Sequence, residues 1–188
     1  MPASSRTSLY IILGILAVLV LWVWTGYNSL VTSKAAVEGE WANVETQYQR
    51  RFDLIPNLVN TVKGAAQFEQ ETFTAVTAAR SQWQSAGTRD AKIDAASQFD
   101  SALSRLLVTV EAYPQLQATQ AFRDFMTQLE GTENRIAVAR RDYNRAVQTY
   151  NVLVRRFPRN ILARVFGFGP EKLFESDEGA DKAPSVNF

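Results

Sequence analysis

Two charged residues lie at positions where an amphipathic helix would place apolar side chains. Glu133 and Arg140 fall on the stripe formed by Leu129, Ile136 and Tyr143 in the last long helical segment. A carboxylate and a guanidinium at such positions are usually paired with each other or with another helix, because an unpaired buried charge is costly. We expect a buried or half-buried ion pair that fixes how the helices pair, with partner recognition as the alternative.

Other polar side chains could join this pair. Arg50 and Arg51 lie near an expected junction between helices, Asn57 and Lys63 flank the next apolar stripe, and Arg80 is a further cation. We expect the partners of Glu133 and Arg140 to come from this group. The full set of candidate structural or partner-binding residues is Arg50, Arg51, Asn57, Lys63, Glu133, Asn134, Arg135 and Arg140.

The composition removes most familiar catalytic chemistry. The 188 residues include no His and no Cys, which excludes a Ser-His-Asp triad, a thiolate nucleophile and the usual zinc sites. The di-iron sites of helical bundles need Glu-x-x-His motifs, and a site for magnesium or calcium has no supporting ligand spacing. A near balance of 20 Lys plus Arg against 19 Asp plus Glu argues against a nucleic-acid partner. We expect no enzyme activity, no cofactor and no metal.

A charge-free run near the N-terminus predicts a membrane anchor. It extends from Leu9 to Trp24 and reaches Tyr27 without a charged residue, a length of roughly 28 Å as a helix, which matches a hydrocarbon core. Trp22, Trp24 and Tyr27 gather at one end, where we expect them at the membrane interface. The small-residue cleavage site of a signal peptide is absent. We therefore expect a retained single-pass anchor at residues 9–25.

Basic residues encode the orientation of this anchor only weakly. Arg6 and the α-amino group precede the anchor, and Lys34 is the nearest basic residue after it. Positive charges favour the cytoplasmic side, so a nearly equal count gives a slight preference for a cytoplasmic N-terminus. We expect the rest of the chain on the extracytoplasmic side.

Beyond the anchor, apolar residues recur at alternating steps of three and four, which is typical of amphipathic helices. No segment shows the period-two alternation of a strand over a useful length. We expect an all-α protein in which the single transmembrane helix continues into an antiparallel four-helix bundle. Representative stripe residues are Val37, Val44 and Phe52; Leu58, Val76 and Trp83; Phe99, Leu106 and Val110; and Leu129, Val147 and Val154.

Breaks in this pattern set the expected helix ends. Gly87 suits a left-handed stop, and Thr88 suits the N-cap of the next helix. Pro114 and Pro158 close the third and fourth segments, because the residue before a proline avoids the α conformation.

Pro56 allows two interpretations. With Asp53 as a cap it could begin a new helix, or it could kink one long helix. We favour a turn. The expected segments are then a short tail (1–8), the anchor (9–25), the bundle (26–157), a basic amphipathic segment (158–174) and a disordered tail (175–188).

The basic segment carries apolar residues at helical spacing, and these could rest on the bundle or on a membrane surface. We favour the bundle. Three aromatic residues, Phe68, Trp83 and Phe125, fall off or beside the main stripes. They could mark an exposed patch for a second copy of the chain, or they could simply broaden the core faces.

Several separated motifs resemble the LemA family. They include YQRRFDLIPNLV at residues 48–59, LEGTENRI at residues 129–136, Tyr143-Asn144 and Tyr150-Asn151. The similarity covers about residues 26 to 168. The resemblance implies a bacterial membrane protein with one span and a helical-bundle domain, for which no enzyme activity or cofactor is established. The chain departs from many relatives at Gln67-Phe68-Glu69, where they have a His.

These observations predict a non-catalytic scaffold or self-assembling module of the bacterial cytoplasmic (inner) membrane, with its bundle outside the cytoplasm. The expected partners are the lipid bilayer, further copies of the chain and other membrane proteins. Two alternatives remain open: an accessory regulator of a membrane protease or transporter, and a hydrolase that uses carboxylates alone.

Overall fold

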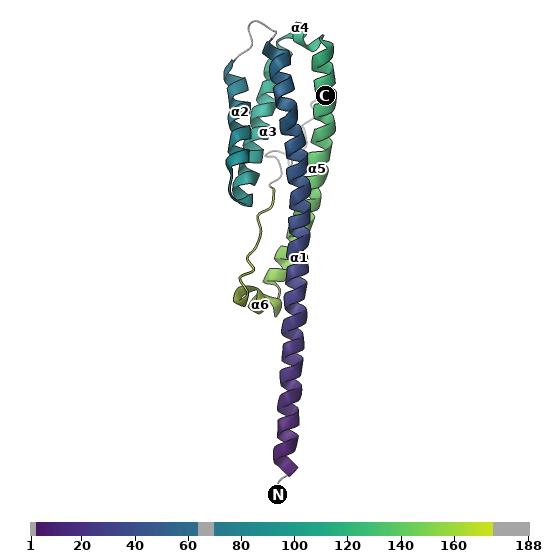
Figure 1. The fold of residues 1–188 in the computed structure, drawn as a ribbon, viewed down its shortest axis with the longest axis vertical. Helices are drawn as coiled ribbons and strands as arrows, with labels where there is room; N and C mark the ends of the chain where they lie inside the picture. The colour runs from purple at the N-terminus through teal and green to yellow at the C-terminus, as the bar shows by residue number, and fades with distance from the viewer. Residues whose placement is uncertain (1–2, 64–69, 175–188) are drawn as a thin grey trace, which may run out of the picture. The chain divides into compact units, whose positions relative to one another are not determined.

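The computed structural model describes residues 3–63 and 70–174, and every regular element in those ranges is a helix (Figure 1). The expected disordered tail at 175–188 and the aromatic Phe68 lie outside the described residues. The all-α prediction is confirmed. The helices are α1 (Ala3–Lys63), α2 (Gln70–Ser85), α3 (Arg89–Glu111), α4 (Pro114–Gln117), α5 (Gln120–Arg155) and α6 (Arg159–Val165).

The chain forms two compact units, and the boundaries after Trp41 and after Arg141 fall inside long helices. Of the described residues, the anchor unit contains 3–41 and 142–173, and the bundle unit contains 42–63, 70–141 and 174. Helices α1 and α5 therefore contribute to both units.

In the anchor unit, α1 carries the apolar run and continues through Gly26 without interruption. It is the one helix in the described ranges that is long and apolar enough to cross a membrane, with a mean hydropathy of 2.3 over its most apolar window. Apolar side chains from Leu9 to Leu21 expose more than half of their surface. A helix satisfies its backbone hydrogen bonds internally, so such a surface suits lipid.

After the apolar run, the same helix acquires a buried face. Leu30, Val37 and Trp41 of α1 are buried in the anchor unit. The rings of Trp41 and of Tyr143 on α5 lie 5.5 Å apart. Residues 168–173 follow α6 without helical structure, and we call them the strap.

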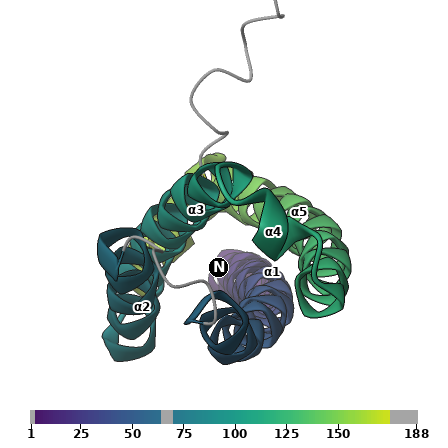
Figure 2. The ribbon, with the colours of Figure 1, turned by 90° about the horizontal axis from the view of Figure 1, so that it is seen from above.

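The bundle unit contains α2, α3, α4 and the remaining parts of α1 and α5. Figure 2 shows α1, α2, α3 and α5 around a common interior, with α4 between α3 and α5. Phe52 of α1 joins three helices, because its ring contacts Trp83 of α2 at 5.0 Å and Phe99 of α3 at 4.7 Å.

Pro56 does not start a new helix, so the favoured turn was wrong. It lies inside α1, which continues to Lys63. Phe52, Ile55 and Leu58 are buried on one face around the exposed proline. A proline inside a helix costs about 3 kcal/mol, and burial of three large apolar side chains exceeds that cost.

The structure decides between the two interpretations of the aromatic residues and corrects the expectation for Gly87. Trp83 and Phe125 are only 5% and 4% exposed, so they belong to the core and do not form a surface patch. Among the described glycines, Gly167 has the left-handed conformation, with φ of 74°, and Gly87 does not have a positive φ. The short connection between α2 and α3 instead turns through extended backbone at Thr88, whose hydroxyl caps α3 by accepting from the N–H of Ala91.

Candidate functional site

Five polar side chains from three helices meet in the bundle unit, and we call them the Asp100 cluster. Tyr48 and Arg51 come from α1, Asp100 from α3, and Glu133 and Arg140 from α5. The helices bring them together because Tyr48 and Phe52 share the buried face of α1, and Phe99 precedes Asp100 on the buried face of α3. Arg51, next to that face, is therefore carried into the interior.

Asp100 is the acceptor at the centre of the cluster. Its Oδ1 accepts from Nη1 of Arg51 at 2.7 Å, and its Oδ2 accepts from the hydroxyl of Tyr48 at 3.1 Å. Arg140 donates to both Asp100 and the Tyr48 oxygen. Arg51 also forms an ion pair with Glu133. One carboxylate thus links α1, α3 and α5.

Burial and pairing act in opposite directions on Arg51. Arg51 is 3% exposed, and this burial lowers the pKa of its guanidinium from the ordinary value. The charge and hydrogen bond of Asp100 raise the pKa and oppose that effect. The guanidinium also lies over the Phe99 ring, 5.9 Å from its centre. A buried arginine in this setting stays protonated and depends on its acidic partner.

The cluster is electrically neutral, since two arginines face two carboxylates. Asp100 accepts from three donors, two of them guanidinium groups. Stabilisation of its charged form by these groups makes it a weak base for removing a proton from a substrate. In the ranges 7–58 and 73–174, no group of three or more His, Cys, Asp or Glu side chains could hold a metal ion. The arrangement is suited to joining helices.

Glu133 does not occupy a core position, contrary to the expectation from its heptad position. Its side chain is 56% exposed, whereas Ile136 on the same helix is 1% exposed. Ile136, three residues after Glu133 on α5, is the buried residue of this turn. The Glu133 carboxylate remains exposed and pairs with Arg51. Arg140, with a side chain 19% exposed, is the more buried of the two.

The other candidate residues lie away from this centre. Arg50, Asn57, Asn134 and Arg135 are exposed. Lys63 ends α1, and its side chain is outside the described part. Of the eight candidates, the structure brings together Arg51, Glu133 and Arg140.

Sequence reasoning missed Asp100 as the centre. A signal was available, because Asp100 follows the stripe residue Phe99 directly, and a buried arginine needs a carboxylate from a neighbouring helix. Tyr48 lies between Val44 and Phe52 at the spacing of the same apolar face, but the sequence does not indicate a partner for its hydroxyl.

A second polar arrangement holds the strap in the anchor unit. The side-chain amide of Asn151 donates to the carbonyl of Glu171 at 2.9 Å and accepts from its N–H at 2.8 Å. The hydroxyl of Tyr143 donates to the carbonyl of Lys172 at 2.8 Å. The Glu171 carboxylate pairs with Lys34 of α1. The strap is therefore attached to both α5 and α1.

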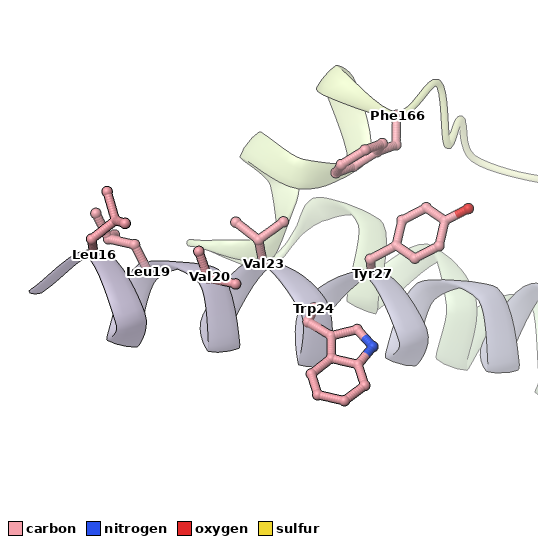
Figure 3. A pocket seen from close by; sticks show the side chains of 7 residues that line it. All are labelled: Leu16, Leu19, Val20, Val23, Trp24, Tyr27 and Phe166. Atoms are coloured by element: carbon pink, nitrogen blue, oxygen red, sulfur yellow. The ribbon is translucent and has the colours of Figure 1, made fainter. Parts of the chain in front are cut away.

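The three aromatic residues expected at the membrane interface follow the apolar run on α1. Trp22 is half-buried, Trp24 is 62% exposed and Tyr27 is 38% exposed. Tyr27 contacts Phe166 and Phe168 edge to face, with ring centres 4.9 and 5.9 Å apart. Figure 3 shows Tyr27 and Val23 directed toward Phe166, beside an open apolar hollow.

These features define an all-helical protein with one potential membrane helix and a bundle joined through a neutral ion-pair cluster. The family model described as "LemA family" matches residues 40–188, and the chain belongs to the LemA family.

Curated relatives agree with this assignment. The chain is 30% identical to "Magnetosome protein MamQ 2" of Paramagnetospirillum magneticum and 28% identical to "Magnetosome protein MamQ" of Magnetospirillum gryphiswaldense. Each match covers 82% of this chain and 66% of the relative, so the chain spans slightly less than two thirds of those proteins. "Protein LemA" of Metamycoplasma hominis is 23% identical, with 80% of this chain and 69% of the relative covered.

Proposed function

We propose that this protein is a non-catalytic scaffold that self-associates or holds partner proteins at a bacterial cytoplasmic membrane. One observation carries the proposal: the apolar run and the buried residues Leu30, Val37 and Trp41 lie on one uninterrupted helix and in one compact unit. An anchor built this way holds its own unit in a fixed orientation to the bilayer. Confinement to two dimensions then raises the effective concentration of neighbouring copies and partners.

The chemistry of the polar residues supports the same proposal. In the Asp100 cluster, the carboxylate of Asp100 pairs with Tyr48, Arg51 and Arg140, which favours a structural role over turnover of a substrate. Arg50, Asn134 and Arg135 remain on the surface as polar groups available for a protein contact. We assign them to partner recognition.

For the orientation, we propose a cytoplasmic N-terminus and an extracytoplasmic bundle. Arg6 lies three residues before Leu9, whereas Lys34 lies seven residues after Tyr27, so the basic residue nearer to the apolar run supports this orientation. Cysteine accessibility tests this directly, because the chain has no natural Cys. A single cysteine in place of the exposed Val108 of α3 should react with an impermeant reagent in intact cells.

The scaffold role is tested with the full-length protein. In mild detergent, size exclusion with light scattering should report a protein mass above 21.1 kDa, and crosslinking in native membranes should trap copies or membrane partners. The variant Arg135→Glu should reduce crosslinking, whereas Arg105→Glu, an equally exposed change on α3, should not. A strictly monomeric particle without crosslinks or co-purifying membrane proteins would overturn the proposal.

A further inference from the structure

Helix α6 packs closely on α1 at the point where the apolar run ends. A Cβ atom added at Gly26 would lie 2.4 Å from Cδ1 of Leu162, so a side chain at position 26 would force Leu162 to move. Leu162 and Ala163 are buried at the contact, with 5% and 1% of their surface exposed. The short helix is thereby fixed beside the aromatic end of the potential membrane span.

An apolar hollow of about 500 Å³ lies along the span next to this contact. Its lining includes Leu16, Val20, Val23 and Phe166, so it extends from the apolar run of α1 to α6 (Figure 3). From Leu16 to Tyr27 the helix rises about 16 Å, close to half of a hydrocarbon core of about 30 Å. The hollow therefore has the length of one acyl chain of a single leaflet.

The segment around α6 is strongly basic. Arg155, Arg156, Arg159 and Arg164 lie within residues 155–170, which contain no Asp or Glu. Three of the four are exposed and Arg159 is half-buried. In the described part of the chain, no carboxylate forms an ion pair with any of them. Guanidinium groups of this kind pair well with phosphate.

We propose that this corner of the anchor unit is a binding site for an anionic phospholipid. One acyl chain occupies the hollow along Leu16, Val20 and Val23, and the phosphate of the headgroup pairs with Arg159 and Arg164. Val165 and Phe166, which are 71% and 46% exposed, enter the interfacial region beside it. The proposal rests on membrane insertion of α1, and it is independent of the scaffold role.

The position of the hollow favours a lipid over other ligands. Most of its lining belongs to the apolar run, which faces hydrocarbon once α1 crosses a bilayer. A soluble anion could use the arginines but would leave the apolar hollow uncovered. A phospholipid matches both features, because its phosphate sits at the interface and its chain extends inward.

The first test measures the depth of α6 in the membrane. The chain has no natural Cys, so Val165→Cys gives a single site for an environment-sensitive fluorophore on the full-length protein. In vesicles containing phosphatidylglycerol, this label should be quenched by spin-labelled lipid and protected from aqueous iodide. Val108→Cys is the matched control, since Val108 is 65% exposed on α3 of the bundle unit. Equal access of iodide to both labels would overturn the proposal.

The second test measures selectivity for the headgroup. Binding of spin-labelled phosphatidylglycerol is compared with that of spin-labelled phosphatidylcholine for the full-length protein and for Arg159→Gln/Arg164→Gln. We expect the preference for phosphatidylglycerol to fall by about fivefold for each guanidinium lost. Arg105→Gln/Arg141→Gln removes the same charge from exposed positions elsewhere and should keep the preference. An equal loss in both variants, or displacement of the lipid by inorganic phosphate, would contradict the assignment.

Discussion

Asp100 on α3 accepts a hydrogen bond of 2.7 Å from Arg51 on α1, and the arginine side chain is only 4% exposed. The guanidinium has given up most of its contact with water, and the carboxylate replaces part of that hydration. The packing of α1 against α3 therefore depends on this pair. Its removal should lower the stability of the bundle unit.

Asp100→Ala should lower the free energy of unfolding by about 3 kcal/mol, because it leaves the buried Arg51 with only a surface partner. Glu133→Ala is the control, and it should cost less than about 1 kcal/mol, since Glu133 is largely exposed. Chemical denaturation of the full-length protein in detergent, followed by circular dichroism, measures both values. Equal losses for the two variants would contradict the central role of Asp100.

Gly26→Ala should destabilise the contact between α1 and α6, although alanine favours a helix by about 1 kcal/mol. The new methyl group would meet Leu162, so the cost should vanish when Leu162 is also replaced by Ala. A double-mutant cycle on thermal unfolding should give a coupling free energy of about 1 kcal/mol or more. Additive effects would show that the two side chains do not compete for space.

Asn151→Ala should release the strap, because its amide makes two hydrogen bonds to the backbone of Glu171. At about 1 kcal/mol for each bond, trypsin cleavage after Lys172 should accelerate roughly tenfold or more. Gln148→Ala is the control, because Gln148 is exposed and lies on α5 three residues before Asn151. This variant should leave the cleavage rate unchanged. Mass spectrometry of the cleaved fragment identifies the site, and similar rates for both variants would count against this role.

Tyr150→Phe should leave stability at neutral pH unchanged or slightly raised. Tyr150 is fully buried, and its hydroxyl has no hydrogen-bond partner among the described residues. An unpaired buried hydroxyl stabilises nothing, and its removal relieves a desolvation penalty. Thermal unfolding of both proteins in the same detergent measures the difference.

The same tyrosine should make the protein less stable in alkali. Burial raises the pKa of Tyr150 above its ordinary value of 10.0, with Lys34 opposing the shift. Above that ordinary value the unfolded chain loses the proton first and binds fewer protons than the folded one, so the free energy of unfolding falls as pH rises toward the raised pKa. Tyr150→Phe should show a shallower decline above pH about 10. Identical pH profiles would exclude Tyr150 as the source.

The helical pattern was predictable because burial repeats along each helix. Val37, Val44 and Phe52 follow the alternating spacing of one face, and all three are buried. Pro56 was not predictable in the same way. Its local preference favours a helix start, but the packing of Phe52, Ile55 and Leu58 keeps α1 continuous, and that packing depends on other helices.

The polar contacts were only partly predictable. The sequence identifies Arg51 and Arg140 as charged residues near apolar stripes, but it does not say which carboxylate reaches them. Asp100 comes from another helix, so its role depends on how α3 is rotated against α1. The contact of Asn151 with the strap depends on a segment without helical periodicity, for which pattern analysis has no signal.

The ion pair between Lys34 and Glu171 joins residues 137 positions apart in the chain. During synthesis, α1 leaves the ribosome and can enter the membrane long before the strap exists. Leu30 and Val37 of α1 can therefore become buried only after later residues have been made. The strap can bind Lys34 only after that. Glu171 is made well after Lys34, so a chain interrupted between them would carry α1 without its partner in the strap.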